Sequence, residues 1–414
     1  MSTEKTLHLF EGIGIELEYM IVDRDTLDVK PISDLVLHAV NGSYSSDYEK
    51  PGICWSNELA LHVIELKTGL PVESLAATLP LFSADIAHIN DILAGHNARL
   101  LPTGAHPWMD PFRETRLWPH HYNAIYESYN RIFDCRGHGW SNLQSTHVNL
   151  PFGNDEEFGR LHAAIRLLLP ILPAIAASTP IVDATLQPSL DHRLEVYRTN
   201  SKRVPSLTGA VIPEPVFSHA DYDREIFQRM YGDIAPYDPD NLLRDEWLNA
   251  RGAIARFDRS AIEIRVLDIQ ECPAADLAIA ALIFRTLKEL CAEGWISSAE
   301  QRQWPVTPLA EIFAAAVRSG EGAVIENPAY LRIFGYGDDA PLTAGQLWQH
   351  ILAQLTEKGL APVNFGAQLK VILDQGTLAS RIRRRLANDC SRRGLATLYR
   401  ELADCLAQGK LFVA

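Results

Sequence analysis

Polar and apolar positions alternate along the first two thirds of the chain, in short runs that predict β-strands. The clearest runs are GIELEYMIV (14–22), ALHVIELKT (60–68) and LQSTHVNLPF (143–152). The segment AIARFDRSAIEIRVLDIQ (253–270) contains two such runs with Asp258 between them, which is typical of a β-hairpin. The early part of the chain is therefore expected to be rich in strands.

Apolar residues recur at helical spacing elsewhere. The spacing predicts a long amphipathic helix over 72–100, with Pro80 at its start or at a kink, and a second helix over 155–178. From Ala274 onward the pattern is helical almost to the end. Strands and helices do not alternate regularly, so the pattern predicts an α+β fold and not a doubly wound sheet.

The chain shows no internal repeat and no long Gly/Ser linker, so nothing in the sequence marks a domain boundary. We expect a single domain over 1–414. Its strand-rich core would occupy 10–275 and its mainly helical part 276–414.

The amino-acid composition excludes some classes of binding partner for such a domain. Acidic residues outnumber basic ones by 52 to 38, which gives a formal net charge of −14. An acidic chain is a poor match for nucleic acid, because phosphates require a basic surface. The most apolar stretch, 167–177, is too short to span a bilayer, and the N-terminus lacks the pattern of a secretory signal. Six scattered cysteines predict neither a zinc site nor a disulfide framework, so we expect a soluble cytoplasmic protein without a membrane partner.

Carboxylates inside the predicted strands are the most informative chemical feature. Glu16 and Glu18 are two residues apart, so a strand directs both to one face, away from Ile15 and Leu17. Adjacent like charges repel each other, and a bound divalent cation such as Mg²⁺ or Mn²⁺ would offset the repulsion. For this pair alone, a solvated outer strand face is the simpler interpretation.

Glu58, Glu65 and His147 can likewise be either metal ligands or ordinary surface and structural residues. Glu65 lies in the apolar run 63–66, where an unpaired charge is costly, whereas Glu58 taken alone is typical of an exposed loop. Their spacing of seven requires a bend between them if both serve one site. His147 lies on a predicted strand and is a candidate nitrogen ligand, although a lone histidine is more often a structural residue.

Glu263 and Arg265 repeat the two-residue spacing with opposite charges. They form either an ordinary ion pair within the strand or a metal ligand beside a guanidinium that stabilises a transferring phosphoryl group. Other basic residues in loops suit phosphate or carboxylate contacts. These candidate binding residues are Arg198, Lys202, Arg203, Arg251 and Arg256.

The segment GTLASRIRRRL (376–386) is also basic, but it is expected to be in large part a solvated helix face with its arginines outward. On such a helix Ile382 and Leu386 would face the core.

No GxxxxGK[ST] phosphate loop and no GxGxxG fingerprint occurs. Instead, the ordered succession GIELEY, NELALHVIELKTG, LLPTGAHPW, QSTHVNLPF and WLNARGAIARFDRSAIEIRVLDIQ resembles the glutamate–cysteine ligase family, in particular its bacterial carboxylate–amine ligase branch. The resemblance covers about residues 10–275. It implies a fold related to glutamine synthetase, with a curved antiparallel sheet around an active-site funnel and helices on its outer face.

The resemblance also implies a chemistry and a set of roles. ATP would phosphorylate the γ-carboxylate of glutamate or a similar acid, and an amine such as cysteine would attack the acyl phosphate. Arg265 falls where the family places an arginine near the phosphoryl group, and Arg198 and Arg251 match further basic positions. Two or three Mg²⁺ or Mn²⁺ ions would be held by the family's metal-binding pattern, which falls on Glu16, Glu18, Glu58, Glu65, His147 and Glu263.

Two other functions stay open at this point. One is a phosphotransferase of the same fold that phosphorylates a guanidino group and needs no second acceptor. The other is a non-catalytic member that binds nucleotide or metal. The sequence leaves the amine acceptor and the oligomeric state open, a homo-oligomer included.

Overall fold

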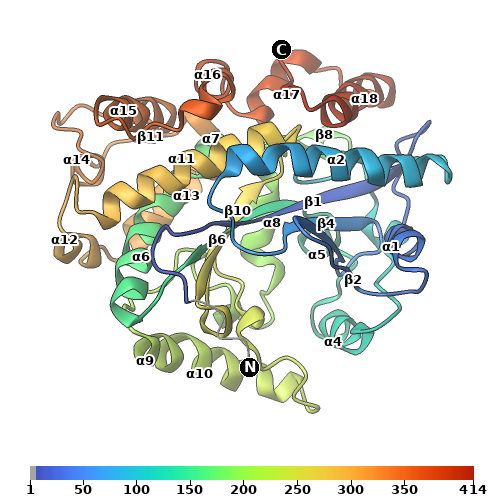
Figure 1. Ribbon diagram of the computed structural model, residues 1–414, viewed down its shortest axis with the longest axis horizontal. Helices are drawn as coiled ribbons and strands as arrows, with labels where there is room; N and C mark the ends of the chain where they lie inside the picture. Colours follow the sequence, from blue (N-terminus) through green and yellow to red (C-terminus); the bar gives the residue numbers. More distant parts are fainter. Residues whose placement is uncertain (1–5) are drawn as a thin grey trace.

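The computed structural model describes residues 6–414 and shows a large antiparallel sheet with helices on both sides (Figure 1). Residues 1–5, on which part of the expectation about a secretory signal rests, lie outside the described range. The predicted α+β class is confirmed. The strands are β1 (Gly14–Asp23), β2 (Asp47–Tyr48), β3 (Ile53–Asn57), β4 (Val63–Thr68), β5 (Ala98–Leu101), β6 (Ser145–Pro151), β7 (Ile181–Val182), β8 (Thr185–Leu186), β9 (Ala253–Arg256), β10 (Ala261–Asp268), β11 (Val324–Ile325) and β12 (Leu342–Thr343).

The large sheet has the strand order β2-β3-β4-β1-β6-β10-β9, and β5 also pairs with β1. All of its pairings are antiparallel. These strands fall between Gly14 and Asp268, as the strand-rich pattern predicted, and β9 and β10 form the expected hairpin around Asp258. The central strands β1 and β6 come from distant parts of the sequence, so the middle of the sheet joins groups that local patterns do not connect.

Helices surround the sheet and form most of the last third of the chain (Figure 1). They are α1 (Ser33–Asn41), α2 (Leu75–Ala94), α3 (Pro111–Glu114), α4 (Asn123–Phe133), α5 (His138–Ser141), α6 (Asp155–Leu168), α7 (Pro173–Ala176), α8 (His192–Asn200), α9 (His219–Tyr222), α10 (Gln228–Ile234), α11 (Pro273–Cys291), α12 (Ser298–Arg302), α13 (Val306–Ser319), α14 (Pro328–Arg332), α15 (Ala344–Glu357), α16 (Gly366–Gln375), α17 (Leu378–Leu386) and α18 (Arg392–Gln408). Within residues 6–414, no helix has both the length and the apolarity needed to cross a membrane.

The outer face of β1 carries the apolar half of its alternating pattern. Ile15, Leu17 and Tyr19 are fully buried in the same core as Phe82 of α2 and Leu277 of α11. Helices α2 and α11 run side by side across this face of the sheet (Figure 1). Because strand side chains alternate, packing of this face turns the intervening Glu16 and Glu18 toward the opposite side.

Two helix predictions were wrong in their extent. The helix expected over 72–100 is α2, which begins after the N-cap Ser74 and contains Pro80 inside it, and the chain then returns as strand β5. The helix expected over 155–178 is interrupted. Helix α6 gives way to a short 3₁₀ turn and then to α7, because Pro170 and Pro173 lack the backbone N–H that a continuous helix needs.

The expectation for 376–386 holds for the exposed Arg384 and Arg385 and for the buried Ile382 and Leu386, but it was wrong for one arginine. Arg381 is completely buried, and its Nη1 lies 2.5 Å from Glu271 Oε1. The same arginine donates to the carbonyl of Phe412, whose N–H in turn donates to Glu271. This buried ion pair holds the C-terminal segment against the end of the sheet, a long-range contact that helical periodicity does not reveal.

A buried histidine on α6 makes the stability of the fold sensitive to acid. Burial and the charge of Arg166 lower the pKa of His162 to about 3, and its ring stacks on Phe158. In the unfolded chain this imidazole binds a proton below about pH 6.5, whereas in the folded protein it stays neutral. Its contribution to stability is therefore present above pH 6.5 and is lost as the pH falls toward 3, at up to about 1.4 kcal/mol per pH unit.

We predict that His162→Phe, which keeps an aromatic ring but cannot titrate, loses less stability than the wild type between pH 7.5 and pH 5. Urea unfolding at both pH values measures the difference. His96→Gln, which removes an exposed imidazole, is the control. Parallel losses in the wild type and His162→Phe would contradict the assignment of His162 as a neutral buried group.

Candidate active site

The register of the central strands brings the acidic residues together. Glu16 of β1 lies opposite His147 of β6, and Glu18 of β1 lies opposite Glu65 of β4. Like charges directly opposite each other destabilise a sheet. The carboxylates of Glu18 and Glu65 are also buried, so the repulsion between them is poorly screened by water.

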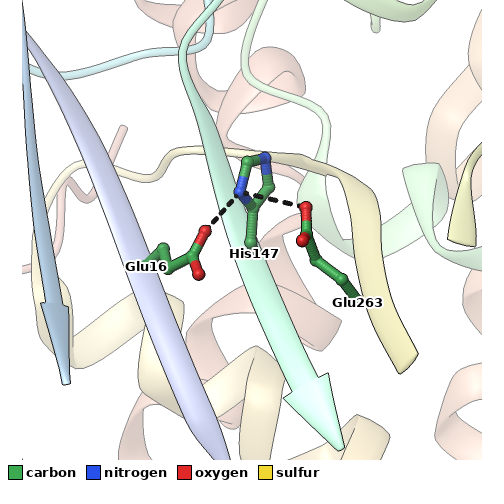
Figure 2. Close-up of side chains that lie close together, drawn as sticks. All are labelled: Glu16, His147 and Glu263. Carbon is green, nitrogen blue, oxygen red and sulfur yellow. Dashed lines mark hydrogen bonds and ion pairs between the residues drawn. The ribbon is translucent and has the colours of Figure 1, made fainter. Parts of the chain in front are cut away.

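His147 lies at the centre of the group, between Glu16 and Glu263 (Figure 2). Its Nδ1 is 2.8 Å from Glu16 Oε2 and 3.7 Å from Glu263 Oε1. Its Nε2 is 2.9 Å from the hydroxyl of Ser145 and 3.9 Å from Glu18 Oε1. One imidazole thus contacts carboxylates from two neighbouring strands through both of its nitrogens.

Polar neighbours partly offset the crowding of the other carboxylates. Glu18 Oε2 accepts hydrogen bonds from the backbone N–H and the hydroxyl of Ser145. Glu65 Oε2 accepts one from Ser56 at 2.5 Å and pairs with Lys67 at 3.2 Å. Glu65, predicted as a costly charge within an apolar run, is therefore a partnered one.

A β-bulge positions the arginine. The pairing of β10 with β6 shifts between Ile264 and Leu267, so that two residues of β10 lie opposite His147. Arg265 is one of these two residues. Its Nε lies 2.9 Å from Glu263 Oε1, which forms the ion pair predicted within the strand, and its Nη1 donates to the carbonyl of Asn249.

The charges of the cluster shift the pKa values of its members. Burial alone would lower the pKa of His147, but the bond to Glu16 and the charges of Glu18 and Glu263 raise it to about 9. Burial and the charges of Glu18 and Glu65 hold the pKa of Glu58 well above its usual range. The group therefore attracts positive charge, which a proton or a metal ion can supply.

The donor atoms fit divalent cations. In Glu16, His147 and Glu263, one ligand atom from each lies within 4.8 Å of the others, and the same holds for Glu18, Glu65 and His147. Carboxylate oxygens suit Mg²⁺ and Mn²⁺, and the crowding of these acids is what a bound cation would relieve. Glu58 lies outside both triads, just past the end of β3, and faces the same cluster from a cavity wall.

The predicted basic residues lie in different surroundings. Arg256 is close to the cluster, with Nη1 3.9 Å from Glu263 Oε2. Arg251 is buried and bonded to Glu214, and Arg198 pairs with Glu195 on the surface of α8. Arg203 donates to the carbonyl of Ile132, and Lys202 is exposed. Roles for these five residues in binding stay predictions, and the geometry brings Arg256 alone among them to the acidic cluster.

A cavity of about 510 Å³ opens beside the cluster. Glu18, Glu58 and His147 border it, together with Arg265. The cavity also contains Arg193, which the sequence analysis missed. Arg193 lies 2% exposed at the start of α8, paired with Asp268.

Helices form the rest of the cavity wall and contribute a group of aromatic side chains that the sequence analysis also missed. We call this group the aromatic wall; it consists of Tyr126, Tyr129, Trp140, Tyr197 and Trp247. Part of it had a signal in the sequence. Tyr122, Tyr126, Tyr129 and Phe133 recur at intervals of three and four residues, the spacing of one helix face.

Comparisons with known proteins identify the family and support the fold. The sequence model that describes glutamate–cysteine ligase family 2 matches residues 12–386 of this chain. An uncharacterized protein of Archaeoglobus fulgidus is 31% identical over 401 residues, which cover 97% of this chain and 100% of the relative. A putative glutamate–cysteine ligase of a Nocardioides species is 30% identical over 182 residues, 44% of each chain.

Among solved structures, the glutamate–cysteine ligase of Francisella tularensis in complex with AMP superposes with a TM-score of 0.57. The sequence identity is 14%, and the match covers 98% of this chain and 93% of the other. At this identity the likeness is one of fold, and it supports the glutamine synthetase-like architecture that the resemblance implied.

We predict that Glu58→Gln stabilises the metal-free protein while weakening its response to Mg²⁺. A carboxyl whose pKa is raised in the folded state costs stability as the pH rises above its ordinary value, so the gain should be larger at pH 8 than at pH 5. Thermal unfolding in EDTA should show a melting temperature a few degrees above that of the wild type. The rise on adding Mg²⁺ should be smaller than in the wild type.

Glu49→Gln, which removes an exposed carboxylate from the same part of the chain, is the matched control. A Glu58→Gln protein that is less stable in EDTA, or that gains as much from Mg²⁺ as the wild type, would contradict this role of Glu58.

Proposed function

Because this chain belongs to glutamate–cysteine ligase family 2, we propose that it is an ATP-dependent ligase that joins a carboxylate of glutamate, or of a similar acid, to an amine. The observation that carries the proposal is the convergence of Glu16, Glu18, Glu65 and Glu263 on His147, with Arg265 beside them. Phosphoryl transfer commonly uses cation ligands of this kind together with a guanidinium near the transferred group.

The reaction has two steps. A carboxylate oxygen of the acid attacks the γ-phosphorus of ATP, an O–P bond forms, the bond to the bridging oxygen breaks, and ADP leaves. The nitrogen of the amine then attacks the carbonyl carbon of the acyl phosphate. The C–O bond to the phosphate breaks, and inorganic phosphate leaves. The nitrogen loses a proton, and the product is an amide.

The two triads divide the task of cation binding. Glu16, His147 and Glu263 would hold one ion, and Glu18 and Glu65 would hold a second with help from Glu58, since a neutral imidazole can ligate only one of the two. Mg²⁺ is the cation that this donor set favours in the presence of ATP. When bound, such ions would offset the negative charge of the phosphates.

The basic residues of the cavity have separate roles in this proposal. Arg265 is held by Glu263 and by the carbonyl of Asn249, so its guanidinium is fixed beside the phosphoryl position before the reaction begins. Arg193 is held by Asp268 and faces the same cavity, where it would bind the second carboxylate of a glutamate-like acid. γ-Glutamylcysteine synthesis is the first specific activity to test.

We predict that the protein forms ADP from ATP, Mg²⁺ and glutamate when an amine is present, and that hydroxylamine traps the acyl phosphate as a hydroxamate. Coupled ADP detection and the iron colour reaction of hydroxamates measure the two products. Glu263→Gln should abolish both while the protein stays folded by circular dichroism. ADP formation with a guanidino compound alone, without amide or hydroxamate from any acid, would instead establish the phosphotransferase alternative.

We predict that Arg265→Lys lowers kcat by about 100-fold or more, while the KM for ATP changes much less. Lysine keeps the charge but lacks the planar fork that contacts Glu263 and Asn249 together. Steady-state kinetics with saturating glutamate separates the two parameters. Equal changes in kcat and in the affinity for ATP would identify Arg265 as a simple nucleotide-binding residue.

A further inference from the structure

The cavity beside the acidic cluster has two chemically different sides. The strands supply Glu18, His147 and Arg265, from β1, β6 and β10, and Arg193 at the start of α8 joins this charged side, since its guanidinium donates to the carbonyl of Arg265. The opposite side is supplied by α4, α5, α8 and the short 3₁₀ turn Glu246–Leu248, which carry the aromatic wall. Cation binding and phosphoryl transfer do not require an apolar surface that faces the reacting groups. We therefore expect this surface to bind a ligand of its own.

The aromatic wall is held rigidly before any ligand binds. The ring of Tyr129 lies 5.3 Å from that of Trp140 and 5.9 Å from that of Trp247, both in tilted contact. Trp140 donates to the carbonyl of Asn200, and Tyr126 accepts a hydrogen bond from Asn57. Rings that are already packed and bonded offer a ligand contact area at little cost in conformational entropy.

The geometry of phosphoryl transfer indicates which substrate meets this wall. The attacking and leaving oxygens lie on opposite sides of the transferred group. Glu18 and Glu58 line the cavity, whereas Glu16 and Glu263, with Asn149 and Arg256 beside them, are not among its described lining residues. Because Arg256 is a guanidinium outside the described lining of the cavity and suits the phosphates of ATP, we assign the nucleotide to its side and the acid and the amine to the cavity.

The acid does not match the aromatic surface. Glutamate is short and carries charge at both ends, and its carboxylates are matched by Arg193 and Arg265 on the charged side of the cavity. A polycationic amine does not match it either. The acidic residues among the described lining of the cavity are Glu18 and Glu58, both beside the metal ligands, and the rim carries the 63% exposed Arg259.

We propose that the acceptor amine bears an aromatic or similarly large apolar substituent, which lies against the aromatic wall while its nitrogen faces the acyl phosphate beside Glu18 and Glu58. This inference rests on the proposed ligase function and names its acceptor class. The small thiol side chain of cysteine would leave most of the wall uncovered. In the reaction the neutral nitrogen forms the C–N bond, phosphate leaves with the electrons of the C–O bond, and the surplus proton of the nitrogen passes to the phosphate.

The test compares amines that differ in the substituent alone. With MgATP and glutamate, the amines are hydroxylamine, methylamine and benzylamine, and the amino acids alanine, cysteine and phenylalanine. Hydroxylamine has no side chain, so its hydroxamate reports the formation of the acyl phosphate independently of the aromatic wall. We expect kcat/KM for benzylamine and phenylalanine to exceed that for methylamine, alanine and cysteine by at least tenfold.

Variants of the wall then locate the preference. In Trp247→Leu, and in Trp140→Leu as a second variant, the ratio of kcat/KM for phenylalanine to that for hydroxylamine should fall by about tenfold. The KM for ATP should stay within twofold of the wild type. Trp304→Leu, a half-buried tryptophan packed on Tyr330, is the matched control and should retain the wild-type ratio.

The possible failures are distinguishable. If hydroxamate forms but cysteine or alanine is used as well as phenylalanine, the aromatic acceptor is refuted and the ligase function stands. If the variants raise the KM for ATP and leave the preference among amines unchanged, the wall binds the adenine ring and the inference is wrong. If no acid gives hydroxamate or ADP, both the proposed ligase function and the proposed acceptor class are refuted.

Discussion

The register of β1 is the constraint on which the site depends. Its outer face buries Ile15, Leu17 and Tyr19 against α2 and α11, and a shift by one residue would place these side chains in the cavity. The packing of that face therefore fixes the opposite face, where Glu18 lies opposite Glu65 and Glu16 opposite His147. The hydrophobic core thus forces the carboxylates together against their mutual repulsion.

The neighbours of these carboxylates offset part of that repulsion. The rest can be offset by a bound ligand of positive charge. Ser145 and Ser56 donate to Glu18 and Glu65, and His147 bridges the carboxylates of neighbouring strands. Hydrogen bonds of this kind orient the oxygens but do not neutralise several charges at once. A site that is ordered yet short of positive charge is suited to bind cations without rearranging, which is the condition for preorganised electrostatic catalysis.

The sequence predicted the features that local geometry determines. The two-residue spacings place Glu16 with Glu18 and Glu263 with Arg265, and strand alternation is enough to derive both. Features that depend on distant contacts could not be predicted. Glu58 has the pattern of an exposed loop residue, but in the fold it is half-buried in the cavity wall, which it shares with Tyr126 of α4. Arg251 and Arg256 belong to the same basic segment of sequence, and only the buried contacts of Arg251 with Glu214 and the carbonyl of Ser206 assign it a structural position. The bulge beside Arg265 likewise follows from pairing with β6, which lies more than a hundred residues earlier in the chain.

The division between the two sides of the cavity has a consequence for how such a protein can change. The cation ligands and Arg265 lie on strands whose register is fixed by the core, so few substitutions there preserve both packing and chemistry. The aromatic wall lies on short helices and a 3₁₀ turn that contribute no pairing to the sheet. Substitutions in these elements can reshape the acceptor side without moving a cation ligand. In the proposed ligase, the acidic strands would then supply the phosphoryl-transfer chemistry, and the helices would determine which amine is accepted.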